Sequence, residues 1–95
     1  MLNNQQLRYL RGLCHPLSPV VIVADQGLTE NVQSEIELAL NCHELIKVKL
    51  RAEREQRSEW IDSIQRTTQA ELVQKIGQVA CFFRPNPDDG KIQLP

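Results

Sequence analysis

The sequence has no long run of apolar residues. Its two longest, positions 20–24 and 79–83, fall far short of the ~20 residues that a membrane-spanning helix needs. The N-terminus, Met-Leu-Asn-Asn-Gln-Gln, lacks a basic head and an apolar stretch, so we expect no signal peptide. Of the 95 residues, 41% are hydrophobic and 24% are charged, which is typical of a globular domain rather than a disordered chain. We therefore expect one soluble domain, located in the cytoplasm and without a membrane partner.

Cysteine is scarce and odd in number: the chain has Cys14, Cys42 and Cys81. Disulfide frameworks of secreted domains use an even and dense set, so we expect all three to be reduced thiols in a reducing compartment. His15 and His43 each follow a cysteine, but adjacent side chains point in different directions and the Cys-x-x-Cys spacing of structural zinc sites is missing. We expect packed or surface residues there, with no metal and no thiol chemistry.

The sequence also lacks an excess of positive charge, since 11 Lys and Arg residues face 12 Asp and Glu residues. Proteins dedicated to nucleic-acid binding are usually basic overall, so such a function would require a local basic patch. Aromatic residues are few, and we expect Trp60 to be core or surface filler rather than a platform for a base. No P-loop or dinucleotide-binding fingerprint is present, and the acidic residues are dispersed. We expect no enzyme, no catalytic residue, no cofactor and no small-molecule substrate.

Hydrophobic periodicity predicts seven elements in the order helix, strand, helix, strand, helix, strand, strand. The expected helices span residues 3–13, 30–42 and 53–68, and the expected strands span residues 20–23, 45–51, 72–76 and 78–84. Asn3 or Asn4 would cap the first helix and Thr29 the second. The helical connections permit parallel strands, whereas the short turn at Gly77 requires an antiparallel hairpin. The predicted fold class is α/β, a single domain with a four-stranded mixed sheet and three helices.

Two features add structural detail to this outline. The first strand, Val20-Val21-Ile22-Val23, is apolar on both faces, which predicts a strand buried in the middle of the sheet. Leu38 lies off the apolar stripe of the helix at 30–42 and should be exposed.

A turn with candidate chemistry connects the first strand to the second helix, and its sequence is Ala24-Asp25-Gln26-Gly27-Leu28, followed by Thr29. A strand that ends in a glycine-containing turn and opens a helix presents free backbone N–H groups and the positive end of the helix dipole. Such a turn suits a phosphate group. The same residues are also consistent with an ordinary turn in which Gly27 adopts a left-handed conformation.

Basic side chains alternate with apolar ones in the second predicted strand. Lys47, Lys49 and Arg51, here called the basic ladder, occupy one face, and the opposite face carries Ile46, Val48 and Leu50. Arg54 and Arg57 continue the positive charge, so positions 45–57 hold five basic and two acidic residues. Positions 28–44 hold four acidic residues and neither Lys nor Arg. The ladder is either a surface for nucleic acid or a solvated strand face, and an acidic helix of the same chain could also neutralise it.

Five motifs, with their order and spacing over about 80 residues, carry a resemblance to a known family. They are Leu-Arg-Gly-Leu-Cys-His-Pro-Leu at 10–17, Gly-Leu-Thr-Glu at 27–30, His-Glu-Leu-Ile-Lys-Val-Lys at 43–49, Phe-Arg-Pro at 83–85 and the terminal Ile-Gln-Leu-Pro. The chain resembles the CRM domain (chloroplast RNA splicing and ribosome maturation), in particular its stand-alone bacterial YhbY-type members. We expect a central position for the strand at 20–23 in this family, and an edge position would count against the resemblance.

The resemblance implies a fold similar to the C-terminal domain of bacterial translation initiation factor three. It also implies RNA binding, association with precursors of the large ribosomal subunit, and a role in their assembly or maturation. The family carries a Gly-x-x-Gly loop before the second helix, similar to the loop with which KH domains clamp a nucleic-acid backbone. In this chain Gly27 retains the second glycine, and Ala24 replaces the first. Asp25 places a negative charge where a phosphate would lie, which should weaken binding.

The prediction is therefore one RNA-binding domain over residues 1–95, with 86–95 as a loop and short tail, acting as a monomer. The candidate RNA-binding residues are Ala24, Asp25, Gln26, Gly27, Leu28, Thr29, Lys47, Lys49, Arg51, Arg11 and Arg84. The alternative is a protein-interaction module that docks on a ribosomal or translation protein through the acidic helix at 30–42 and Leu38.

Overall fold

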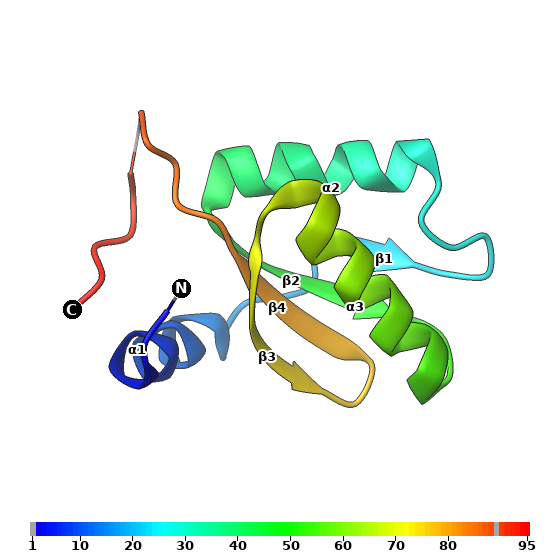
Figure 1. The fold of residues 1–95 in the computed structure, drawn as a ribbon, viewed down its shortest axis with the longest axis horizontal. Coiled ribbons are helices and arrows are strands. Elements are labelled where there is room, and N and C mark those ends of the chain that lie inside the picture. Colours follow the sequence, from blue (N-terminus) through cyan, green and yellow to red (C-terminus); the bar gives the residue numbers. More distant parts are fainter. Residues whose placement is uncertain (1, 89) are drawn as a thin grey trace.

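The computed structural model describes residues 2–88 and 90–95, and its elements follow the predicted order (Figure 1). They are α1 (Asn4–Cys14), β1 (Val21–Val23), α2 (Glu30–His43), β2 (Leu45–Leu50), α3 (Arg54–Thr68), β3 (Glu71–Ile76) and β4 (Val79–Phe83). The predicted fold class is confirmed, since three helices accompany one four-stranded mixed sheet. No helix among these residues is long and apolar enough to cross a membrane.

The strand order in the sheet is β1-β2-β4-β3, with β1 parallel to β2 and both other pairs antiparallel. The prediction that the strand at 20–23 is central is wrong, because β1 lies at an edge and pairs only with β2. Val21 and Val23 face the core, whereas the Ile22 side chain between them is 52% exposed. A run of β-branched residues indicates a strand, but its place in the sheet depends on which strands pair with it.

Helices cover the two faces of the sheet unequally. In Figure 1, α2 and α3 lie over one face and α1 lies against the other, near the end that holds both termini. The larger core cluster joins α2 and α3 to the sheet and includes Ile36, Leu40, Ile64 and Phe82. The smaller cluster joins Leu10 and Cys14 of α1 to β2, β3 and β4. The face that carries α1 is therefore only partly covered.

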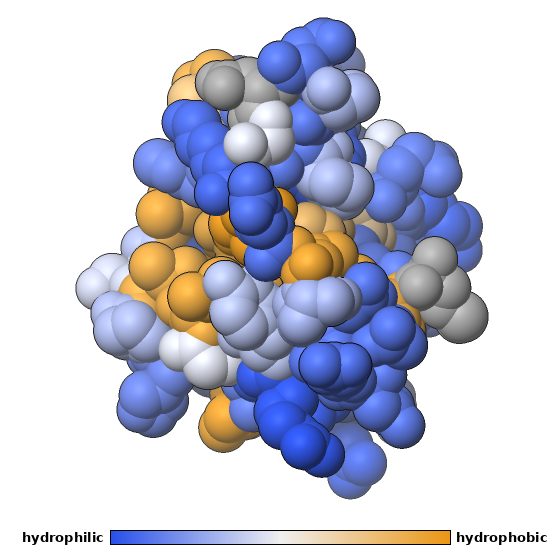
Figure 2. Space-filling model, turned by 90° about the vertical axis from the view of Figure 1, so that its left-hand side faces the viewer, coloured by the Kyte–Doolittle hydropathy of each residue, from blue (hydrophilic) through white to orange (hydrophobic). Residues whose placement is uncertain are grey.

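The end of the molecule that holds both termini exposes apolar side chains between polar ones (Figure 2). A hollow of about 510 Å³ lies at this end and is lined by Leu13, Leu17 and Ile92 among others. Leu13, at the end of α1, and Leu17, beyond it, are both more than one-third exposed.

The ends of α1 and α2 confirm the capping predictions. Asn3 caps α1, because its side chain accepts from the Gln6 N–H at 2.8 Å while the Gln6 side chain accepts from the Asn3 N–H. The Thr29 hydroxyl accepts from the Val32 N–H at 3.2 Å and caps α2. Glu53 precedes α3, and its side chain makes no capping bond.

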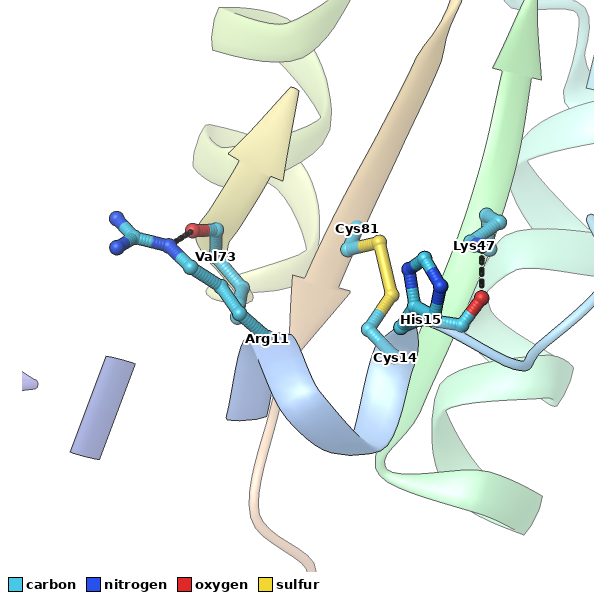
Figure 3. The surroundings of a disulfide bond; sticks show 6 residues. All are labelled: Arg11, Cys14, His15, Lys47, Val73 and Cys81. Carbon is cyan, nitrogen blue, oxygen red and sulfur yellow. Dashed lines mark hydrogen bonds between the residues drawn. A yellow bond between two sulfur atoms is a disulfide. The ribbon is translucent and has the colours of Figure 1, made fainter. Parts of the chain in front are cut away.

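Cys14 and Cys81 form a disulfide bond, so the prediction that all three cysteines are reduced is wrong for this pair (Figure 3). The two residues are 67 positions apart in the sequence, and both are buried in the smaller cluster. The pairing follows from the packing of the last turn of α1 on β4, which the spacing of cysteines along the chain does not reveal. Cys42 is a free, exposed thiol, as expected.

Glu44 is a buried carboxylate between α2 and β2, with a positive φ of 61° and only 1% of its surface exposed. Its two oxygens accept hydrogen bonds from the backbone N–H groups of Asn86, Lys91 and Ile92 at 2.6–2.9 Å. Burial by itself would raise the pKa of Glu44. The hydrogen bonds from these N–H groups and the nearby Lys91 charge lower the pKa by more than burial raises it, so the pKa lies below its ordinary value. Glu44 therefore attaches the C-terminal tail to the domain as a charged group.

Glu44→Gln should lower the free energy of unfolding by about 1.5–3 kcal/mol at pH 7, measured by urea denaturation. An amide presents only one acceptor oxygen to the three N–H donors and points its own N–H groups at the others. Because the folded-state pKa is depressed, the carboxylate contributes fully above its unfolded pKa of about 4.3 and loses its contribution as the pH falls through the folded-state pKa. The difference between the two proteins should accordingly shrink below about pH 4.

Glu35→Gln is the matched control, because Glu35 is an exposed residue of α2. It should change stability by less than about 0.5 kcal/mol. Equal stability of the Glu44→Gln protein and the control at pH 7 would contradict a structural role of the Glu44 charge.

Candidate nucleic-acid interface

The loop of residues 24–27 is a tight turn at the end of β1. The Gly27 N–H donates to the carbonyl oxygen of Ala24 at 2.8 Å, and the Thr29 N–H donates to the carbonyl oxygen of Gly27 at 3.0 Å. Gly27 has a φ of +73°, a conformation that glycine adopts without strain and that other residues adopt rarely. Gly27 therefore has the left-handed conformation with which the sequence is consistent.

Several backbone donors of the loop remain available to a ligand. The turn uses the N–H of Gly27, but within the described chain the N–H groups of Asp25, Gln26 and Leu28 donate to no protein acceptor. A depression of about 350 Å³ beside the loop is lined by residues 24–27 and Thr29, together with Ile22 and Val32. The loop can therefore offer amide donors to an anion, although the exposed Asp25 carboxylate lies in the same rim.

The Trp60 side chain lies beside Gly27 of this loop. Its side chain belongs to the larger core cluster and is only 9% exposed, which confirms the expectation that it is not an open stacking platform. A Cβ built on Gly27 would lie 3.6 Å from the indole Nε1, an ordinary contact distance. The sequence does not reveal this proximity, because Trp60 and Gly27 are more than 30 positions apart. Substitution of Gly27 thus encounters an unfavourable backbone angle rather than a lack of space.

The basic ladder has the predicted alternation along β2. Ile46, Val48 and Leu50 are buried against α2 and α3, whereas Lys47 and Lys49 are half-buried on the opposite face and Arg51 is exposed. Lys47 Nζ donates to the carbonyl oxygen of His15 at 3.3 Å (Figure 3). The single ion pair among the residues that the structure describes joins Arg84 to Glu37, so no described acidic helix neutralises the ladder.

The loop and the ladder meet at one end of the sheet. The Arg51 N–H donates to the carbonyl oxygen of Val23 at 2.8 Å, and Ala24 is the next residue. Because β1 and β2 are parallel, both strands end here and their following residues lie together. Lys49 and Lys47 extend from this point along β2, at ~6–7 Å per two residues. The structure thereby brings together Ala24, Gly27 and the three ladder cations.

Arg11 and Arg84, the remaining predicted site residues, lie elsewhere. Arg84 follows β4 at the opposite end of the sheet, where Phe83 pairs with Leu45. Its guanidinium donates to the Glu37 carboxylate, the Asn41 side chain and the Thr68 carbonyl at 2.8–3.0 Å, which connects α2, α3 and β4. Arg11 Nε donates to the carbonyl oxygen of Val73 on β3, the edge strand far from β1. Both arginines make contacts that stabilise the fold.

The paired cysteine and histidine motifs form no metal-binding cluster in the described part of the chain. Cys14 is oxidised and Cys42 is exposed, and nowhere in residues 2–88 and 90–95 do three His, Cys, Asp or Glu side chains gather in a geometry that could hold a metal ion. The candidate interface offers the backbone amides of the loop and the cationic side chains of the ladder.

Comparisons with known proteins identify one family. The CRS1 / YhbY (CRM) domain matches residues 2–84. An RNA-binding protein of Haemophilus influenzae is 50% identical over 95 residues, which cover 99% of this chain and 95% of the relative. A probable RNA-binding protein of Pseudomonas aeruginosa is 46% identical over 91 residues, which cover 95% of this chain and 88% of the relative.

A solved structure shares the fold. The solution structure of a Staphylococcus aureus protein, described as a candidate RNA-binding protein, matches with a TM-score of 0.85 and 33% identity over the full length of both chains. The edge position of β1, which we expected to count against the resemblance, is therefore compatible with it. The family match spans every helix and strand of the sheet domain. The chain belongs to the CRS1/YhbY (CRM) domain family.

Proposed function

We propose that this chain binds RNA through the 24–27 loop and the basic ladder. The observation that carries the proposal is the meeting of the two at one end of the sheet, where Arg51 lies beside Ala24 through its hydrogen bond to Val23. Relatives named as RNA-binding proteins support this assignment. The near-neutral net charge is compatible with it, because RNA affinity depends on phosphates neutralised locally.

Each part of the surface has a separate role. The N–H groups of Asp25, Gln26 and Leu28, together with the N-terminus of α2, hold one phosphate group. The ladder cations contact further phosphates along the same strand. None of these groups reads a base edge, so we expect binding of many sequences with a strong dependence on salt.

We further propose that the RNA is ribosomal RNA in precursors of the large subunit, where the protein assists maturation without catalysis. It acts as a cytoplasmic monomer and requires neither metal nor cofactor. The resemblance to the CRM domain supports this finer assignment, and Arg11 and Arg84 add at most long-range positive charge to it.

Lys47→Ala combined with Lys49→Ala should weaken binding to unrelated single-stranded RNAs and reduce the salt slope by ~1.4, that is ~0.7 for each lost phosphate contact. Fluorescence anisotropy at several salt concentrations measures both effects. The variant should remain folded, because exposed or half-exposed charges contribute little to stability.

Arg8→Ala combined with Arg66→Ala is the matched control, since both arginines are exposed and lie on α1 and on the last turns of α3. It removes the same net charge and should leave the salt slope unchanged. An equal loss of slope in both double variants would mean that the ladder has no specific role.

A pair of substitutions at Gly27 separates charge from backbone strain. Asp and Asn have nearly the same shape and both tolerate a positive φ, so Gly27→Asp and Gly27→Asn should be similarly stable. Gly27→Asp should bind RNA roughly five-fold more weakly than Gly27→Asn at low salt, from about 1 kcal/mol of repulsion between charges near contact. Asp25→Asn should tighten binding by a similar factor. Identical affinities of all three variants would show that the loop is only a turn.

Sedimentation distinguishes RNA binding from the alternative of protein docking. Leu38 is 65% exposed on α2, as that alternative requires. On gradients of cell extract, brief ribonuclease treatment should release the unmodified protein from large-subunit precursors. Without ribonuclease, the Leu38→Glu variant should still sediment with these precursors. Association that survives ribonuclease and is lost in Leu38→Glu would favour docking on a protein.

A further inference from the structure

A second basic site lies outside the loop and the ladder. A hollow of about 180 Å³ separates the first two turns of α3 from the β3–β4 hairpin, and Arg54, Arg57, Ser58, Lys75 and Gly77 contribute to its lining. Three of its lining residues are cations, and they come from two different elements. No residue of this lining is acidic. The sequence does not predict this convergence, because Lys75 is about twenty residues beyond α3's first turns.

The three cations are not neutralised by the fold. Arg57 donates from one guanidinium nitrogen to the carbonyl oxygen of Ala52 at 2.7 Å, which positions the group and leaves its other N–H donors available. Within the described chain, the side chains of Arg54 and Lys75 donate to no protein acceptor and are in no ion pair. The hollow therefore concentrates positive charge without a counter-ion from the protein.

The placement of the arginines is unfavourable for the helix itself. Arg54 and Arg57 occupy the first turns of α3, where the helix dipole is positive and repels cations. Glu53 makes no capping bond, and Glu55 is the acidic residue of the first turn. Neither glutamate forms an ion pair with Arg54 or Arg57 within the described chain, so an anion bound in the hollow would neutralise guanidinium charge that the helix leaves unpaired.

The hollow shares its end of the sheet with the loop and the ladder. β2 ends and β4 begins there, with the Leu50 N–H donating to the Gln78 carbonyl. Lys75 pairs with the buried Ala80, which places the Lys75 side chain on the helical side of the sheet, opposite to Lys49. Arg54 and Arg57 therefore do not continue the ladder on its open face. They lie beyond Arg51, on the other side of the sheet end.

We propose that this hollow binds a backbone phosphate of the same RNA strand that contacts the loop and the ladder. This inference rests on the proposed function. Two guanidinium groups, an ammonium and the Ser58 hydroxyl supply many donors, which suits a phosphate oxyanion. The described lining has no aromatic side chain on which a base could stack. A strand crossing the end of the sheet contacts the ladder on one side and the hollow on the other.

Arg54→Gln combined with Lys75→Gln tests the proposal, because both side chains lack protein partners and their loss should leave the fold intact. Binding is measured by fluorescence anisotropy on oligouridylates of increasing length at several salt concentrations. Short oligonucleotides, which reach only the loop and ladder, should bind the variant and the unmodified protein equally. Longer ones should bind the variant more weakly, with a salt slope lower by ~0.7. Arg8→Gln with Arg66→Gln is the charge-matched control and should show no length-dependent loss.

Two failures are distinguishable. Equal affinities of the hollow variant and the unmodified protein at every length, while the Lys47 and Lys49 double variant binds weakly, would overturn the hollow and retain the proposed function. Absence of binding by the unmodified protein at every length would overturn the proposed function itself.

A measurement on the unmodified protein gives an independent answer. Long oligouridylate should shift the backbone amide resonances of Ser58 and Gly77 together with that of Gly27, whereas a short one should shift Gly27 alone. Inorganic phosphate by itself provides the comparison for a free anion. If phosphate shifts Ser58 and Gly77 but long RNA leaves them unchanged, the hollow takes free phosphate and the proposal is wrong.

Discussion

The parallel pairing of β1 with β2 is the contact on which the candidate RNA surface depends. It aligns Val23 with Leu50, and the bond from the Arg51 N–H to the Val23 carbonyl brings the ends of the two strands together. The loop and the ladder are at least twenty positions apart along the chain, so only this pairing makes them neighbours. The α2 connection that separates them is held by Ile36 and Leu40 in the larger core. The helical connection between these parallel strands thus also assembles the proposed binding surface.

Charge is divided between the fold and the proposed interface, which explains why the net charge of −1 is uninformative about function. Glu37 and Glu44 are engaged internally, one with Arg84 and the other with the N–H groups of the tail. The ladder cations and those of the hollow have no such acidic partners within the described chain. A nearly neutral protein can therefore present cations at this end of the sheet that are in no ion pair within the described chain, although Asp25, Glu53 and Glu55 lie at the same end.

Local patterns predicted most of the secondary structure correctly. The order of elements, the Asn3 and Thr29 caps and the alternation of the ladder depend on residues close together in sequence, for which propensity and periodicity are sufficient. Two predictions failed, namely the central position of the strand at 20–23 and the reduced state of the Cys14 and Cys81 pair. Both depend on which distant segments pack together, and β4 decides both by inserting beside β2 and by carrying Cys81 under α1.

The sequence by itself determined the elements, the left-handed turn at Gly27 and the basic face of β2, because each follows from the chemistry of neighbouring residues. The family motifs indicated where a candidate phosphate-binding loop lies. Only the tertiary structure decided that Arg51 lies beside the loop, that Glu44 holds the tail and that Arg54, Arg57 and Lys75 converge. These contacts join residues that are distant in the chain, and they form because strand pairing and helix packing bury apolar surface wherever the side chains fit.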